Sequence, residues 1–137
     1  MHRSAFLTHL LDATNAHDVD RIADCFTADY DNRTPCHPSR GFVGTDQVRR
    51  NWTGILAGIP DLVADVVAES STGDELWSEW EMHGTRPDDS PHVMRGVIIF
   101  TVEGDRARSC RFYLEPVDAT QLTADGFVAT LTPSGPP

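Results

Sequence analysis

Two carboxylates at alternate positions of one predicted strand could carry acid–base chemistry. Glu79 and Glu81 share one side of the segment 76–82, and Glu115 directly follows the last predicted strand. Carboxyl groups gathered in a cleft can move protons to and from a substrate. Charges at every second position more often mark a strand face that meets solvent or a partner subunit. The three glutamates are therefore weak catalytic candidates, and their role depends on which sheet face is enclosed.

One arginine stands among apolar neighbours in a later predicted strand. If Arg95 shares a face with Val97 and Leu114, burial of its guanidinium group is costly without a polar or anionic partner. Tyr30 and Asn32, which lie on one side of a short predicted strand, are the expected partners, joined to Arg95 by a ligand or water. The alternative is an arginine at a strand end that reaches solvent along its own apolar stem.

The sequence contains no recognisable metal or cofactor site. Cys25, Cys36 and Cys110 lack the spacing of a zinc site, and the histidines share no spacing. A glycine-rich phosphate loop and a nucleophile-elbow motif are also missing from the sequence. We expect no cofactor, no metal and reduced thiols.

The composition describes one acidic domain. A chain of 137 residues is long enough to bury one core, and its formal net charge of −10 offers no field for a phosphate backbone. Nucleic acid is therefore not an expected partner. No apolar run is long enough to cross a membrane or to form the core of a signal peptide, so we expect a cytoplasmic protein.

Hydrophobic periodicity predicts the elements that must position these residues. Three helices are predicted over residues 3–15, 18–26 and 46–59, with Asp18 and Asp46 as caps and Pro60 ending the third. Strands are predicted over residues 29–33, 62–69, 76–82, 93–102 and 110–114. Helices followed by a run of antiparallel strands predict an α+β domain with the helices on one sheet face.

The last two predicted strands form a hairpin closed by Glu103 and Arg106. Regular pairing from that turn places Arg95 opposite Leu114 and Val97 opposite Phe112. The predicted inner face then holds Arg95, Val97, Ile99, Cys110, Phe112 and Leu114, together with Leu76, Ser78, Trp80 and Met82. The predicted outer face holds Trp77, Glu79, Glu81, His83, Gly96, Arg111, Tyr113 and Glu115. A single bulge would invert this assignment.

Taken together, these segments resemble the nuclear transport factor 2-like superfamily, particularly its SnoaL-like branch. The resemblance covers about residues 5–117: the helix pair ending AHDVDRIADCFTADY, the loop RGFVGTDQVRRNW, the strand WSEWEMHGT and the hairpin ending RFYLEP. It implies an α+β cone in which three helices pack on a curved, mainly antiparallel sheet, commonly in homodimers formed through the outer sheet face. We expect one domain over residues 1–117 and a C-terminal tail, 118–137, that is partly disordered.

For two enzyme types within this resemblance, the residues at the matching catalytic positions of this sequence do not fit the reaction. A ketosteroid isomerase needs a carboxylate base and a tyrosine with a protonated aspartic acid, and these positions fall at Thr34, Leu10 and Val97. The SnoaL-like cyclases use an acidic residue, and Glu115 points outward in the predicted register.

The limonene-epoxide-hydrolase pattern is closer. Tyr30 and Asn32 fall where that family positions its water, and Arg95 falls where it has an arginine between two aspartates. The aspartates themselves fall at Phe112 and Val97, so the proton transfers of that reaction have no carrier.

The expected function is binding of a small, largely apolar molecule in an enclosed pocket. The expected ligand-binding residues are Tyr30, Asn32, Trp52, Trp80, Arg95, Val97, Phe112 and Leu114. The alternative is a SnoaL-like enzyme of cyclase, isomerase or epoxide-hydrolase type, acting on a hydrophobic polyketide-like substrate through Glu79, Glu81 or Glu115. A third possibility is a dimerisation unit without a ligand, which a filled interior would favour.

Overall fold

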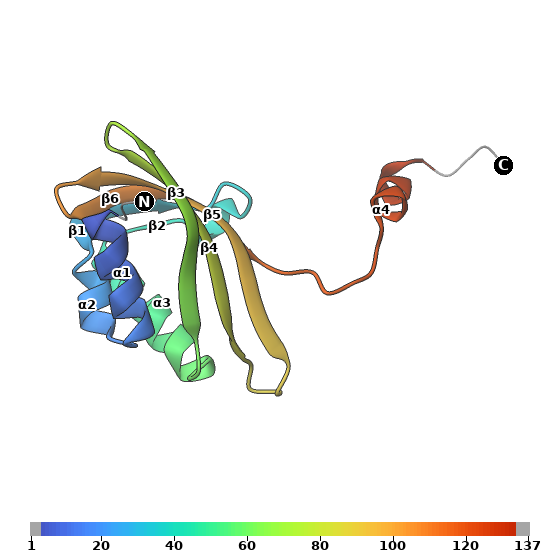
Figure 1. Ribbon diagram of the computed structural model, residues 1–137, viewed down its shortest axis with the longest axis horizontal. Helices are drawn as coiled ribbons and strands as arrows, with labels where there is room; N and C mark the ends of the chain where they lie inside the picture. The colour runs from blue at the N-terminus through green and yellow to red at the C-terminus, as the bar shows by residue number, and fades with distance from the viewer. Residues whose placement is uncertain (1–3, 134–137) are drawn as a thin grey trace.

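Three helices cover one face of a six-stranded sheet in the computed structural model, which describes residues 4–133 (Figure 1). The strand order is β2-β1-β6-β5-β4-β3, and β1 and β6 form the one parallel pair of this sheet. The elements are α1 (Ala5–Asn15), α2 (Val19–Ala23), β1 (Phe26–Arg33), the 3-10 turn η1 (Pro38–Arg40), β2 (Phe42–Val43), α3 (Thr45–Gly58), β3 (Val63–Thr72), β4 (Glu75–Thr85), β5 (Pro91–Glu103), β6 (Arg106–Pro116) and α4 (Ala124–Leu131). The predicted α+β cone is confirmed.

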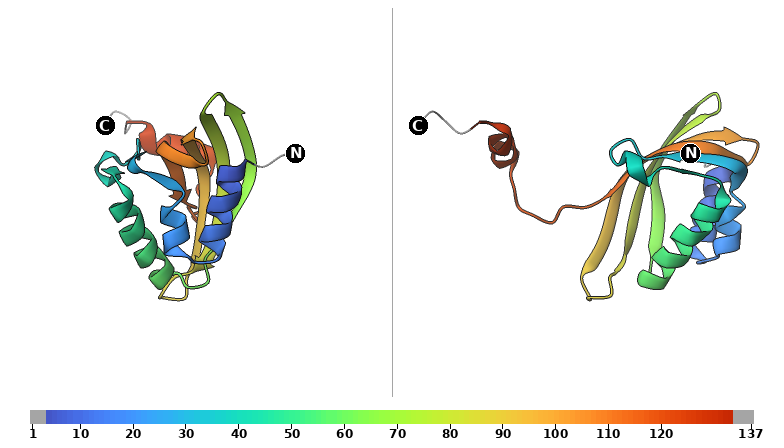
Figure 2. Two further views of the ribbon diagram at one scale, coloured as in Figure 1. Left: turned by 90° about the vertical axis from the view of Figure 1, so that its left-hand side faces the viewer. Right: turned by 180° about the vertical axis from the view of Figure 1, so that it is seen from behind.

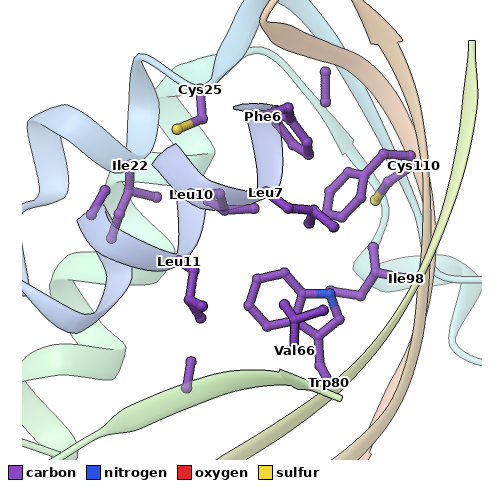
Figure 3. Packing of buried hydrophobic residues seen from close by; sticks show 14 of the residues in the cluster. Phe6, Leu7, Leu10, Leu11, Ile22, Cys25, Val66, Trp80, Ile98 and Cys110 are labelled. Atoms are coloured by element: carbon purple, nitrogen blue, oxygen red, sulfur yellow. The ribbon is translucent and has the colours of Figure 1, made fainter. Parts of the chain in front are cut away.

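The N-terminal helix pair fills one end of the sheet's concave face. The side chain of Ser4 caps α1, and that of Asp18 caps α2 as the sequence predicted. The apolar stripe of α1 is almost wholly buried, and Figure 3 shows Leu7 extending from α1 toward Trp80 and Ile98 of the sheet. Burial of these side chains forms the main core.

The β5–β6 hairpin departs from the predicted pairing through a bulge. Glu103 pairs with Arg106 as expected, but the register then shifts, so that Arg108 is an extra residue between Ala107 and Ser109. Such a bulge leaves one residue unpaired and moves all later pairs by one position. A sequence pattern of alternating residues does not reveal it, because the residues on both sides of the bulge still alternate.

Because of the bulge, two residues predicted to lie on the inner face of the sheet lie on its outer face. Arg95 lies opposite Glu115 and Val97 opposite Tyr113, so both side chains project from the outer, convex face of the sheet. The prediction that Arg95 and Val97 point into the cone is therefore wrong. The inward residues of β5 are His92, Met94, Gly96, Ile98 and Phe100. The predicted inner residues of β4 and β6 are correct.

Gly96 allows β5 and β6 to come close together at the centre of the sheet. Its φ is +155°, and a Cβ at this position would lie 2.1 Å from the carbonyl oxygen of Tyr113. Gly96 also lies opposite Trp80 on β4, so the missing side chain leaves room for the indole on the concave side.

The third helix covers the sheet loosely. Gly44, with φ of +94°, precedes α3 at the cap position, and Asp46 lies in the first turn, so the predicted cap is wrong. Of the whole helix only Val48 is buried, while Trp52 and Leu56 pack partly against the core. Space is therefore left between α3 and the strands.

The chain leaves the sheet at the end of β6. Pro116 pairs with Met94, and the Val117 N–H group donates to the Val93 carbonyl oxygen at 2.9 Å. Beyond this point α4 lies away from the sheet (Figure 1, Figure 2). The sequence analysis assigned no helix or strand to this tail, and α4 lies within it; residues 134–137 of the expected tail lie outside the described residues. No helix in the described chain is both long and apolar enough to cross a bilayer.

Candidate functional site

A cavity of about 720 Å³ lies between α3 and the concave face of the sheet. Its buried lining residues form a floor that includes Trp80, Ile98, Phe100 and Leu114. Its exposed lining residues form a mouth that includes Arg40, Arg50, Asn51 and Ile55. The volume falls within the range of ordinary small-molecule sites.

Most of the residues expected to bind a ligand line this cavity. The lining includes Tyr30, Asn32, Trp52, Trp80, Phe112 and Leu114. Arg95 and Val97 do not line it, because the bulge in β6 turns them to the other face. The side chain of Trp80 also serves the core, since it is only 1% exposed and its indole N–H donates to Ser78 Oγ at 2.8 Å.

Three polar side chains meet at the inner end of the cavity. The hydroxyl of Tyr30 lies 2.9 Å from Asn32 Oδ1 and 2.9 Å from Cys110 Sγ, and Cys110 Sγ lies 3.1 Å from Asn32 Oδ1. Tyr30 and Asn32 reach this point because they are two residues apart on β1. Cys110 faces them because β1 and β6 pair in parallel, with Asn32 beside Cys110.

This polar corner is uncharged at neutral pH. Burial raises the pKa of Tyr30 well above its usual value, and the neighbouring Cys110 adds to the effect. Burial also raises the pKa of Cys110 to about 11. Both groups therefore keep their protons, and the Asn32 amide oxygen can accept from them.

The amide nitrogen of Asn32 is available to a guest molecule. Within residues 4–133 no acceptor lies within hydrogen-bond distance of Asn32 Nδ2, and no fully buried side-chain nitrogen or oxygen lacks a partner. Asn32 is 9% exposed and lines the cavity, so its amide N–H group opens toward that space. An N–H group in this position can donate a hydrogen bond to a neutral oxygen atom.

The three candidate glutamates lie away from the cavity. Glu79 is exposed on the outer face, Glu81 pairs with Arg95 at 3.4 Å, and Glu115 lies 2.8 Å from His37 Nε2. Among the described residues no carboxylate lines the cavity. Acid–base chemistry on a molecule in this cavity therefore cannot pass through these three side chains.

His92 is the titratable side chain of the lining whose ordinary pKa lies closest to neutral. It projects inward from β5 near the mouth, and its pKa is lowered by partial burial and then by the positive charge of Arg86. At neutral pH its imidazole is therefore uncharged and can accept a proton. In the described part of the chain no three acidic, histidine or cysteine side chains are grouped as metal ligands.

The lining residues that sequence reasoning did not assign to the site include Cys110, His92, Arg40 and Arg50. Cys110 was interpreted only as a buried thiol, and its contact with Tyr30 depends on the parallel pairing of β1 with β6. His92 would have followed from the correct register of β5. Arg40 and Arg50 lie on a loop and on a helix flank, where alternation gives no signal.

Comparisons with known proteins identify the fold and the family. A comparison with curated proteins found no match. Among solved structures, an epoxide hydrolase/cyclase-like enzyme, SalBIII, with a role in pyran ring formation in the polyether salinomycin, is 16% identical with a TM-score of 0.70, covering 80% of this chain and 88% of that chain. IdmH, a proposed polyketide cyclase from Streptomyces antibioticus, is 18% identical with a TM-score of 0.69, covering 80% and 89%.

A third solved structure resembles the chain equally well. It is a hypothetical protein with a ketosteroid isomerase-like fold from Catenulispora acidiphila DSM 44928, in complex with trimethylamine, 15% identical with a TM-score of 0.69 and coverage of 79% and 84%. At these identities the structural matches establish the fold alone. The family model described as SnoaL-like domain matches residues 7–109, and the chain belongs to this family.

Proposed function

We propose that this protein binds a small, largely apolar molecule in the cavity beneath α3. The observation that carries the proposal is an accessible space of about 720 Å³ whose walls are mainly apolar and whose inner end presents the free amide N–H of Asn32. Apolar walls supply affinity by removing surface from water, and one fixed donor supplies orientation.

The ligand in this proposal carries an oxygen acceptor at its inner end. Asn32 Nδ2 donates to a carbonyl or ether oxygen, while Tyr30 and Cys110 hold the Asn32 amide in position through its oxygen. The body of the ligand packs against Trp52 and Phe112. A neutral acceptor fits this end because, within residues 4–133, the side chains of Tyr30, Asn32 and Cys110 have no cationic hydrogen-bond partner.

Fluorescence titration with the neutral dye N-phenyl-1-naphthylamine, followed by displacement with 2-decanone, tests this function. We expect the dye to bind and the ketone to displace it. Asn32→Leu should weaken ketone binding about fivefold, the loss of one hydrogen bond, while dye affinity stays within about twofold. Asn51→Leu, which changes an asparagine at the mouth, is the matched control and should leave the ketone affinity unchanged. Failure of a folded wild-type protein to bind the dye would contradict the proposal.

A second candidate function is proton abstraction, and the position of His92 favours it. In this function a carbonyl group of the ligand lies near the mouth, and the neutral imidazole removes a proton from the carbon beside it to leave an enolate. The versions that use Glu79, Glu81 or Glu115 are not proposed, because these residues lie on the other face.

Deuterium exchange into 2-decanone, followed by NMR, tests the enzymatic candidate. His92→Gln should reduce exchange to the background rate, whereas His83→Gln on the outer face should retain it. Because the pKa of His92 is lowered from 6.5, the wild-type rate should hold at pH 6.5 and fall only in more acidic solution. Equal rates for wild type and His92→Gln would exclude His92 as the base.

We further propose a homodimer formed through the outer sheet face, in the cytoplasm, where its free cysteines stay reduced. Support comes from exposed apolar side chains on β3 and β4, namely Val63 at 55%, Val67 at 52% and Trp77 at 46%. Sedimentation velocity should detect a dimer in the wild type and a monomer in Trp77→Lys. A monomeric wild type at micromolar concentration would contradict the dimer.

A further inference from the structure

Five of the ten described arginines pair with carboxylates, and two of the other five line the cavity. All basic residues other than histidine are arginines, and five described ones pair with carboxylates on surfaces away from the cavity. These pairs are Arg33–Asp31, Arg49–Asp20, Arg95–Glu81, Arg108–Asp74 and Arg111–Glu75. The two arginines that line the cavity have no carboxylate partner in the described structure.

Arg40 and Arg50 reach the mouth from two different segments. Arg40 ends η1, and its guanidinium group makes no hydrogen bond or ion pair to another described residue. Arg50 lies on α3 and donates to the neutral Gln47 side chain, Nη2 to Oε1, at 2.6 Å. The neighbouring Arg49 turns away and pairs with Asp20. Two positive charges therefore border the mouth without an ion-pair partner among the described residues.

The charge of the whole protein makes this arrangement unusual. The sequence has 21 acidic residues against 11 basic ones, yet none of the acidic side chains of residues 4–133 lines the cavity. Both arginines are exposed, so their positive field lies at the mouth, where solvent and salt partly screen it. The site therefore has a positive mouth and a neutral floor.

We propose that the ligand is an amphipathic carboxylic acid, with its carboxylate held by Arg40 and Arg50 at the mouth and its oxygen-bearing tail directed to Asn32. This proposal rests on the function proposed above and specifies its ligand class. Planar guanidinium groups match carboxylate oxygens in geometry and charge. A carboxylate at the floor is excluded because Tyr30 and Cys110 offer no compensating charge there.

The matching chemical class is a medium-length carboxylic acid with a keto or ether oxygen near its other end. The keto oxygen accepts from Asn32 Nδ2, the chain packs against the apolar walls, and the acid group stays half solvated between the arginines. The polar groups of the site are thus matched at both ends, and the middle of the ligand needs none.

Displacement of N-phenyl-1-naphthylamine by 9-oxodecanoic acid and by its methyl ester tests the proposal. The two probes differ by one negative charge, so the ratio of their affinities measures how much the arginines at the mouth favour a carboxylate. At 50 mM salt we expect the wild type to bind the acid about tenfold more tightly than the ester. The preference should shrink at 500 mM salt, since salt screens charges at an exposed mouth. The pair Arg40→Gln and Arg50→Gln, made together, should abolish the preference and leave ester and dye affinities unchanged.

Arg49→Gln is the matched control, since it removes the same charge from the same helix outside the cavity lining. It should retain the preference for the acid. Thermal melts verify that every variant is folded. If the double variant is unfolded, the single variants Arg40→Gln and Arg50→Gln replace it in the test. If dye and ester bind but the acid binds no tighter, or if removal of the mouth arginines leaves the preference intact, the ligand class is wrong and the binding function stands. If neither dye nor ester binds the folded wild type, the binding function fails as well.

Discussion

Helices α1 and α3 lie on the same face of one sheet, but a packed core lies beneath α1 and a cavity lies beneath α3. α1 buries Phe6, Leu7, Leu10, Leu11, Ala13 and Thr14, whereas α3 buries only Val48. Both helices show an apolar stripe in the sequence. An apolar stripe therefore predicts that a helix packs on the sheet, but it does not predict whether a core or a cavity lies between them.

The difference lies in the side chains beside each stripe. Gly54 and Gly58 of α3 line the cavity, and a Cβ at either position would meet no atom within 4 Å. Glycine in a helix costs about 1 kcal/mol relative to alanine, so these positions weaken α3 without any packing gain. The cavity thus depends on small residues on α3. Substitutions that reduce side chains on α1 or enlarge them on α3 test this explanation.

The largest expected effect is on the packed side. Leu7→Ala should lower the free energy of unfolding by about 3–4 kcal/mol, because Leu7 is fully buried and its loss leaves a void. Ile55→Ala on α3, where the side chain is 38% exposed at the cavity mouth, should lower it by less than about 1 kcal/mol. Urea denaturation measures both values, and equal losses would contradict the contrast between the helices.

The next effect is alkaline destabilisation through one thiol in each region. The pKa values of Cys25, near α1 and α2, and of Cys110, at the cavity, are raised from 9.0 to about 11, chiefly by burial. A raised pKa favours the protonated form in the folded state, so each contribution is complete below pH 9 and is lost as pH rises toward 11. Each loss reaches about 3 kcal/mol at most.

Urea denaturation between pH 8 and 11 measures this loss, and Cys25→Ala and Cys110→Ala separate its two parts. Each variant should reduce the pH dependence by a similar amount. A much smaller reduction in Cys110→Ala would mean that water in the cavity hydrates its thiolate, which would sharpen the contrast between the packed and hollow regions.

Substitutions that add volume should have opposite signs on the two helices. Gly54→Ala should raise the free energy of unfolding by about 0.5–1 kcal/mol, because alanine favours the helix and open space receives its Cβ. Ala13→Leu on α1, at a site 1% exposed, should destabilise by overpacking. Gly54→Leu should in addition reduce binding of N-phenyl-1-naphthylamine. A stabilising Ala13→Leu would show that α1 is not closely packed.

The smallest effect is expected at Arg95. Its side chain is 58% exposed and pairs with Glu81 on the outer face, and exposed ion pairs contribute about 0–1 kcal/mol. Arg95→Ala should leave the thermal midpoint within a degree or two and the affinity for 9-oxodecanoic acid unchanged. A loss of ligand affinity in this variant would show that Arg95 contributes to ligand binding after all.

The sequence predicted the fold well because helix stripes and strand alternation are local. The inner residues of β4 and β6, including Trp80, Cys110 and Phe112, followed from alternation alone. The inner residues of β5 did not, because the extra residue Arg108 reverses which β5 residues face the cavity. The arginines at the mouth were also not predicted, because the direction of the Arg40 side chain depends on tertiary structure and leaves no periodic pattern in the sequence.

The exit of the chain beside Met94 has a practical meaning for work with this protein. Met94 lines the cavity and pairs with Pro116, and the next residue, Val117, donates its N–H group to the carbonyl oxygen of Val93. An environment-sensitive fluorophore on residue 118 would therefore start close to a lining residue of the cavity, and its emission would report whether the cavity is occupied.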